Sequence, residues 1–209
     1  QEMFSYADGC TMSSKKDALA PIGGFVAVKD EGLYKKMAPH LVLMEGFLTY
    51  GGQSGNNMEA LAQGLQECIK EDYLRYRIKE VKYLADKLVE LGVPIVKPFG
   101  GHAVFVDAAA ILPHIARNEF PAQALNNVLY LEAGVRATES GSLSTGRGQT
   151  AANEHLRLTI PHRFFTKDHL DYIAYMVWRV MKKDHKIKGL KFTYEPSSLR
   201  AFSAKFKLS

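Results

Sequence analysis

Apolar residues recur every three or four positions between Met58 and Leu91, with polar residues between them. This spacing is close to the period of an α-helix, so the pattern predicts one continuous amphipathic helix. Gly92 and Pro94 follow and predict where the helix ends. At about 1.5 Å per residue, such a helix would be roughly 50 Å long. A helix of that length in a small globular chain predicts a connector between two domains.

Shorter patterns on either side of this helix predict a mixture of strands and further helices. A continuous apolar run predicts a buried strand at Ile22–Val28, and shorter apolar runs predict strands at Val93–Val96, Ala103–Asp107 and Leu156–Ile160. Helical signals predict a short helix of about eight residues capped by Asp30, and longer helices at Pro121–Ala133 and Lys167–Lys183. Polar stretches predict a flexible turn at Tyr50–Asn57 and a mobile loop at Ser140–Asn153.

These elements predict an α/β chain in three parts. Residues 1–56 form a remnant of one domain, residues 57–91 form a linking helix, and residues 92–209 form a C-terminal α+β domain. Each part is bounded by residues that favour turns, chiefly the glycines before residue 57 and after residue 91.

Composition narrows the class of protein. The 209 residues are 46% hydrophobic and 23% charged, which argues against a disordered chain, a collagen or a disulfide-stapled miniprotein. A net charge of +5 does not demand nucleic acid, and no apolar run approaches the roughly 18–20 residues of a membrane span. Two cysteines and seven scattered histidines suggest neither a disulfide framework nor a metal array. The first residues lack the regions of a signal peptide, so we expect a cytoplasmic protein. From the modest charge and the lack of a long apolar run, we expect neither nucleic-acid nor membrane partners.

The search for catalytic groups leaves a lysine pair as one candidate. No nucleophile elbow, zinc-protease, CxxC or Walker A motif occurs in the chain. Lys15 and Lys16 follow Ser13 and Ser14 in a polar loop. One interpretation is a solvated basic turn. The other is a Schiff-base lysine, because a neighbouring cation favours the neutral amine that attacks a carbonyl.

Arg157 is the second candidate. It alternates with apolar residues in the predicted strand Leu156–Ile160, so its side chain lies on one face of that strand. A guanidinium there could bind a carboxylate through two parallel hydrogen bonds, or it could form a surface ion pair at a sheet edge.

Taken together, segments along nearly the whole chain resemble the tryptophanase and tyrosine phenol-lyase family, whose members are β-eliminating lyases that use pyridoxal phosphate (PLP). The segment with the cofactor lysine is Tyr6–Asp17. The resemblance continues, in order, through Glu45–Gly52, Gly100–Asp107, Phe120–Leu125, Leu156–Pro161 and Gly189–Pro196. It implies the C-terminal half of a fold type I PLP enzyme: the end of the large α/β domain, a long linking helix and the small α+β domain.

The resemblance implies a role for each residue of the cofactor segment. Lys16 would form the Schiff base with PLP and Lys15 would tune the site. Ser13 would bind the cofactor phosphate. The backbone carbonyl of Pro21 matches a position that binds a monovalent cation, usually K⁺.

The resemblance also implies how substrate is bound. Arg157 would hold the α-carboxylate, and Tyr50 would lie near a site shared between subunits. Ser140 stands where tyrosine phenol-lyases carry an arginine, and Ala201 stands where the two enzymes carry different aromatic residues. Neither substrate signature is therefore intact. Other segments favour tryptophan as substrate, with tyrosine or the substrate of a related β-eliminating lyase as alternatives.

Members of this family are about twice as long as this chain. The resemblance implies that an N-terminal half would supply the rest of the PLP site, from the same precursor or from another chain. We therefore expect the chain alone to be inactive and the complete enzyme to be a tetramer of full-length chains. A non-catalytic fragment or partner subunit is the alternative.

Overall fold

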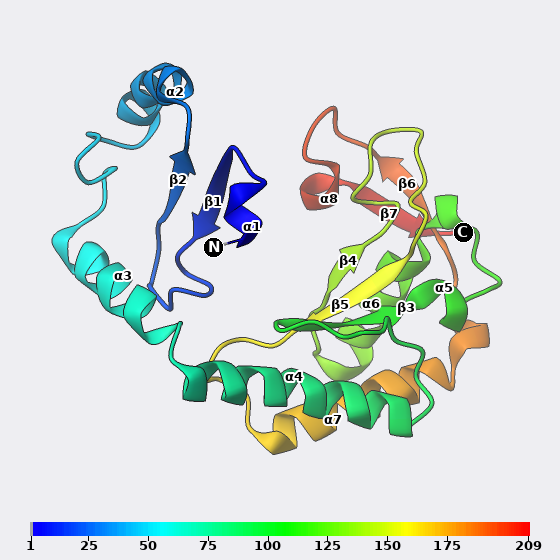
Figure 1. Ribbon diagram of the computed structural model, residues 1–209. Helices are drawn as coiled ribbons and strands as arrows, with labels where there is room; N and C mark the ends of the chain where they lie inside the picture. Colours follow the sequence, from blue (N-terminus) through cyan, green and yellow to red (C-terminus); the bar gives the residue numbers. More distant parts are fainter. Residues whose placement is uncertain (1) are drawn as a thin grey trace. The chain divides into compact units, whose positions relative to one another are not determined.

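The computed structural model describes residues 2–209, and the chain divides into two compact units between Arg75 and Tyr76 (Figure 1). The first unit contains two strands and several helices. In order, these are α1 (Glu2–Ser5), β1 (Gly9–Ser13), β2 (Gly24–Val28), α2 (Glu31–Met44), α3 (Gly55–Glu67) and the start of α4 (Glu71–Glu90). The boundary between the two compact units falls inside α4.

The first unit is organised around an antiparallel hairpin. Strands β1 and β2 pair from Gly9 opposite Val28 to Ser13 opposite Gly24. The predicted strand is present, but the expectation that it is buried is wrong, because Phe25 and Val26 remain exposed. Each strand has a single neighbour among the described residues, and the apolar side chains Phe25 and Val26 are exposed to solvent.

Helix α2 begins where the sequence predicted and runs further. The Asp30 carboxylate accepts a hydrogen bond from Leu33 N at 2.5 Å, which satisfies one of the free N–H groups of the first turn. The helix has 14 residues in place of about eight.

The predicted continuous helix at 57–91 is wrong, because two helices occupy this segment. Helix α3 ends at Glu67 and α4 begins at Glu71. Lys70 N donates to Glu67 O at 3.1 Å in the turn between them, and Lys70 O then accepts the first hydrogen bond of α4. Glu71 and Asp72 favour a new helix start, because carboxylates stabilise the N-terminal end of the helix dipole. The apolar spacing continues across the break and so conceals it.

Helix α3 packs directly on the loop that follows β1. Gly64 is buried, and a Cβ at this position would overlap the carbonyl of Ala18, which is also fully buried. The loop between β1 and β2, which carries Lys15 and Lys16 and is called the lysine loop below, can therefore approach α3 this closely only because residue 64 has no side chain.

Gly64→Ala is therefore expected to destabilise the first unit by roughly 3 kcal/mol, the upper end of overpacking costs, because a backbone carbonyl cannot rotate away as a side chain can. Urea unfolding followed by circular dichroism measures the change. Gly55→Ala is the matched control on the same helix, since nothing lies within 4 Å of its Cβ position. Equal stability of the two variants would contradict this account of the packing.

The second unit is a two-layer α/β domain. Its strands form a sheet of order β3 (Ala103–Asp107), β5 (His155–Thr159), β4 (Thr138–Ser140), antiparallel throughout. A separate hairpin pairs β6 (Leu190–Tyr194) with β7 (Lys205–Leu208). The helical elements are α5 (Ala108–Ile111), η1 (Arg117–Glu119), α6 (Pro121–Ala133), α7 (Lys167–Met181), η2 (Asp184–Lys186) and α8 (Arg200–Ser203).

The core of this unit lies between one face of the sheet and three helices. Val104, Val106, Leu156 and Leu158 alternate inward and are buried with residues of α4, α6 and α7. Figure 1 shows α4 and α7 side by side, and the Tyr83 hydroxyl of α4 donates to Asp171 Oδ1 of α7 at 2.5 Å. The other face of the sheet is therefore left for residues with a different role.

Most of the predicted elements of the second unit are confirmed. Helix α6 has the predicted bounds, and β3, β5 and α7 lie within two residues of theirs. The predicted strand Val93–Val96 is wrong, because only Ile95 makes an isolated bridge, to Val106. Among residues 2–209, no helix combines the length and the apolar character needed to cross a membrane.

Candidate functional site

The loop after β1 is closed by hydrogen bonds through Ser14. Ser14 N donates to Gly23 O at 3.0 Å, and Ala20 N donates to Ser14 O at 3.0 Å. The Ser14 hydroxyl, which is fully buried, donates to Ile22 O at 3.1 Å. The loop thus has a fixed base formed by its own main chain.

The two lysines lie at the exposed tip of this loop. Lys16 N donates to Ser13 O at 3.2 Å, so the lysine stands in a tight turn directly after the strand. The Lys15 and Lys16 side chains are exposed, and Ser13 is half-buried. Because the Ser14 hydroxyl is committed to Ile22, Ser13 is the serine whose hydroxyl suits a phosphate. An exposed primary amine beside such a hydroxyl fits PLP, which attaches to a lysine through its aldehyde and carries a phosphate.

The remaining predicted residues of the first unit differ in their surroundings. Pro21 belongs to the lysine loop and lies between Ala20 and Ile22, which both form hydrogen bonds with Ser14. Tyr50 lies in the turn after α2, with its ring 5.9 Å from that of Phe47. Gln53 was missed by sequence reasoning, although its side chain lies 3.1 Å from the Cβ position of Gly23. The Gln53 side chain, from the turn that follows Tyr50, therefore lies beside Gly23 of the lysine loop.

Arg157 lies in the central strand of the second unit's sheet. It pairs with Phe105 of β3 on one side and with Thr138 of β4 on the other. Its Nε is buried and has no hydrogen-bond partner among the described residues. A buried guanidinium N–H without an acceptor lowers the free energy of unfolding. A bound carboxylate would accept this hydrogen bond and remove that cost.

Ser140 and His155 share the open face of the sheet with Arg157. They pair opposite one another in β4 and β5, and each lies two residues from a member of the Thr138–Arg157 pair. His155 was missed as a neighbour of Arg157, although strand alternation alone places it on the same face. The structure thus gathers Arg157, Ser140 and His155 in the second unit and Ser13, Lys15, Lys16 and Pro21 in the first.

Two buried carboxylates hold the loop between β4 and β5. Glu154 Oε1 accepts from Ser142 N at 2.8 Å, and Glu139 Oε1 accepts from Leu143 N at 3.1 Å. The Ser144 hydroxyl donates to Glu139 Oε2 at 2.6 Å. Gly141 lies between the two, since a Cβ there would be 2.6 Å from Glu154 Oε2. The loop predicted to be mobile is therefore anchored at its start.

Burial raises the pKa of the Glu139 carboxyl above its usual value of 4.5, with a further contribution from the Glu154 charge, while hydrogen bonds from Ser144 and Leu143 oppose the rise. The folded protein thus binds this proton more tightly than the unfolded chain does. The free energy of unfolding therefore loses a contribution as the pH rises from 4.5 through the raised pKa.

Glu139→Gln is accordingly expected to be more stable than the parent at pH 8 and to lose that advantage toward pH 4.5, as urea unfolding at both pH values would measure. Glu132→Gln is the control of opposite sign. Lys183 holds the pKa of Glu132 below its usual value, so that substitution costs stability at pH 8 and nothing in acid. A Glu139→Gln variant that is less stable than the parent at pH 8 would contradict the burial argument.

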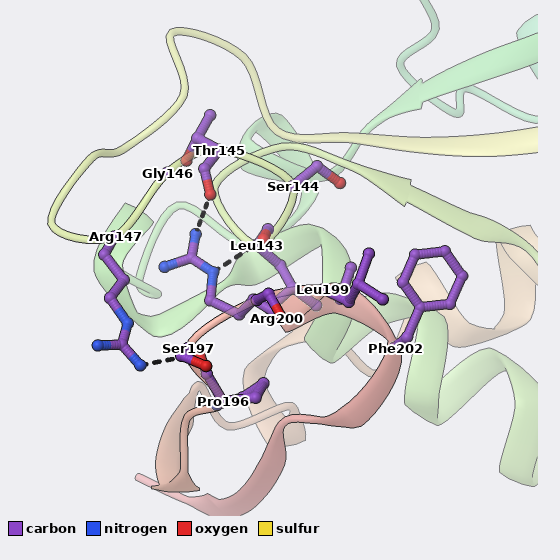
Figure 2. A pocket seen from close by; sticks show the side chains of 12 residues that line it. Leu143, Ser144, Thr145, Gly146, Arg147, Pro196, Ser197, Leu199, Arg200 and Phe202 are labelled. Atoms are coloured by element: carbon purple, nitrogen blue, oxygen red, sulfur yellow. Dashed lines mark hydrogen bonds between the residues drawn. The ribbon is translucent and has the colours of Figure 1, made fainter. Parts of the chain in front are cut away.

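An open hollow of about 460 Å³ lies beside this loop (Figure 2). Its walls are the stretch Leu143–Arg147 and the stretch Pro196–Phe202. Over the described part of the chain, no three His, Cys, Asp or Glu side chains come together in a way that could hold a metal ion.

Comparison with known proteins confirms the resemblance inferred from the sequence. The profile of the family described as "Beta-eliminating lyase" matches residues 1–176. A tyrosine phenol-lyase of Symbiobacterium sp. (strain SC-1) is 50% identical over 99% of this chain and 46% of its own length. A tryptophanase of Salinibacter ruber is 48% identical over 98% of this chain and 44% of its own length. The chain thus spans about half the length of these relatives and corresponds to their C-terminal part.

The fold comparison agrees. The solved structure of a Sphingomonas wittichii serine palmitoyltransferase matches with a TM-score of 0.58 and 14% identity, over 89% of this chain and 42% of that one. The architecture is that of a fold type I PLP enzyme, as the sequence predicted. With the profile match covering most of the residues described above, this chain belongs to the beta-eliminating lyase family.

Proposed function

We propose that this chain supplies the cofactor lysine and the carboxylate-binding arginine of a PLP-dependent lyase that eliminates the β-substituent of an aromatic amino acid. The observation that carries the proposal is the buried, unpartnered Nε of Arg157 on the open face of the sheet. Buried hydrogen-bond donors in folded proteins rarely lack an acceptor. A bound ligand that accepts a hydrogen bond from the Arg157 Nε would supply one.

The cofactor, when bound through Lys16, would supply the electron sink for loss of the Cα proton and of the β-substituent. Ser13 would donate its hydroxyl to the cofactor phosphate, and Arg157 would bind the substrate carboxylate through its guanidinium. Lys16 would hold the cofactor, and its amine, when free, would take the proton from Cα as a general base. Arg157 would fix the orientation of the substrate carboxylate, which limits the orientations that the substrate can adopt.

We propose tryptophan or tyrosine as the substrate, because the sequence segments and the most similar relatives favour different amino acids. Sequence segments favoured tryptophan, whereas tyrosine phenol-lyases are the more frequent among the most similar relatives. Both amino acids release pyruvate and ammonia on β-elimination, with indole or phenol as the second product. Either product, measured beside pyruvate, assigns the substrate.

We further propose that an N-terminal half, from the same precursor or from another chain, completes the site. Large apolar side chains exposed on β2, on α2 and in the turn after it support this, since such surface favours association. Under this proposal the chain alone is inactive, the complete enzyme is a homotetramer with Tyr50 near a site shared between subunits, and the Pro21 carbonyl binds K⁺.

Co-expression of this chain with the N-terminal half of a tyrosine phenol-lyase, followed by pyruvate assays with tyrosine, tryptophan and serine, tests the proposed function. Pyruvate from one of the aromatic amino acids, and none from the chain alone, is the expected result. An assembly that binds PLP stoichiometrically and releases no pyruvate from either would overturn the proposal in favour of a non-catalytic partner.

A further inference from the structure

Two arginines join the loop after Ser140 to the segment before β7, and they point in opposite directions (Figure 2). Arg200, from α8, donates to three loop carbonyls: Nε to Leu143 O at 3.1 Å, and Nη2 to Ser142 O and Thr145 O, both at 2.6 Å. Arg147, from the loop, donates to the carbonyls of Glu195 and Pro196 at 3.0 and 2.8 Å. We call these contacts the arginine clasp.

The two arginines differ in burial. The Arg200 side chain is 11% exposed and pairs with Glu195 Oε1 at 3.1 Å, whereas the Arg147 side chain is 56% exposed and lies 3.7 Å from the same oxygen. A buried guanidinium with several fixed acceptors is held far more firmly than an exposed one. Its planar fork is also what reaches several acceptors at once, which the single ammonium of a lysine does not reproduce. Arg200 is therefore the dominant member of the clasp.

The same two loop residues are held from the opposite side by carboxylates. Glu154 accepts from Ser142 N and Glu139 accepts from Leu143 N, while Arg200 binds the carbonyls of both residues. The backbone of residues 142–143 is thus held by negative groups at its N–H side and by a positive group at its C=O side. Removing Arg200 would leave these carbonyls without that donor and only one side of the loop anchored.

This loop connects the two strands that carry the proposed substrate contacts. It leaves β4 directly after Ser140 and returns through Glu154, three residues before Arg157. We infer that Arg200 is a positioning residue: through the loop it fixes the ends of β4 and β5, and with them Ser140 and Arg157. The inference rests on the proposed function, because that proposal gives Arg157 its role in binding the substrate carboxylate. The hydrogen bonds of the arginine clasp do not depend on it.

The clasp also explains how the hollow is formed. With Arg200 turned inward to the loop, its neighbours Leu199 and Phe202 remain 72% and 86% exposed and line the hollow. Leu199 adopts a left-handed backbone with φ of 51°, a conformation that a branched residue keeps only when its surroundings hold it there. Arg200 is the next residue along the chain, and its side chain is fixed by the loop carbonyls.

The test compares Arg200→Gln and Arg200→Lys with Arg147→Gln in the complete assembled protein. We expect Arg200→Gln to raise the KM for the amino acid by about tenfold or more with kcat changed by less than about threefold, because an interaction that positions the carboxylate contact is lost. Amide exchange at Ser142 and Leu143 should accelerate by about tenfold or more. Arg200→Lys should fall between the parent and Arg200→Gln, and Arg147→Gln should change either quantity by less than about twofold.

Unchanged amide exchange at these two residues in Arg200→Gln, or an equal effect of Arg147→Gln, would overturn the inference. A loss expressed in kcat with unchanged KM would also overturn it. If Arg200→Gln fails to fold, the same comparison is made with Arg200→Lys. If the parent releases no pyruvate, the proposed function fails separately, and amide exchange together with the Kd for tyrosine still decides whether Arg200 positions the site.

Discussion

Lys16→Ala is expected to lower pyruvate formation by the assembled enzyme by at least about 10³-fold, because it removes both the covalent attachment of the cofactor and the base that takes the Cα proton. Lys16 is exposed at the tip of a loop whose base is fixed through Ser14, so its removal leaves the fold intact. Pyruvate release under saturating PLP and substrate measures the effect.

Lys36→Ala provides the control for this experiment. Lys36 is an exposed lysine on α2 in the same unit, and its loss should leave turnover within about twofold of the parent, as expected for a surface substitution. If Lys16→Ala keeps more than about a tenth of the parent rate, Lys16 is not the general base, and its assignment is contradicted.

Arg157→Met should show the second large effect, with loss of activity and no loss of stability. Removing a charge-assisted, paired contact to a carboxylate costs about 3–4 kcal/mol, which corresponds to a fall in kcat/KM of roughly 10²–10³-fold. The free energy of unfolding should stay equal or rise, because Met removes a buried Nε that has no partner. Substrate kinetics and urea unfolding on the same preparation measure both quantities.

Arg179→Gln is the matched control for Arg157, since Arg179 is an exposed arginine on α7 in the same unit. We expect little change in kcat/KM from this substitution. If Arg157→Met instead lowers stability by several kcal/mol and leaves KM unchanged, Arg157 serves the fold and does not bind substrate.

Local pattern predicted the elements that carry the candidate site, because each depends on short-range preferences. The alternation around Arg157 placed its side chain on one sheet face, and Asp30 and Pro121 marked helix starts. The assignment of Lys16 needed the family resemblance, because two lysines in a polar loop are equally compatible with a solvated turn.

The features that were missed depend on contacts between residues far apart in the sequence. The approach of Gly64 to Ala18 and the hold of Arg200 on Ser142 and Leu143 leave no periodic signal. The break at Lys70 escaped because apolar residues keep the same spacing on both sides of it. Such contacts are decided by tertiary packing, which overrides local preference.

The most direct test of Lys16 as the cofactor lysine is to find which residue of the chain carries the cofactor. The assembled enzyme would be incubated with PLP, treated with borohydride to fix the cofactor to its lysine, digested, and its peptides weighed by mass spectrometry. We expect the label on a single lysine of this chain, Lys16. Label on any other lysine, or pyruvate formation without label on Lys16, would contradict it.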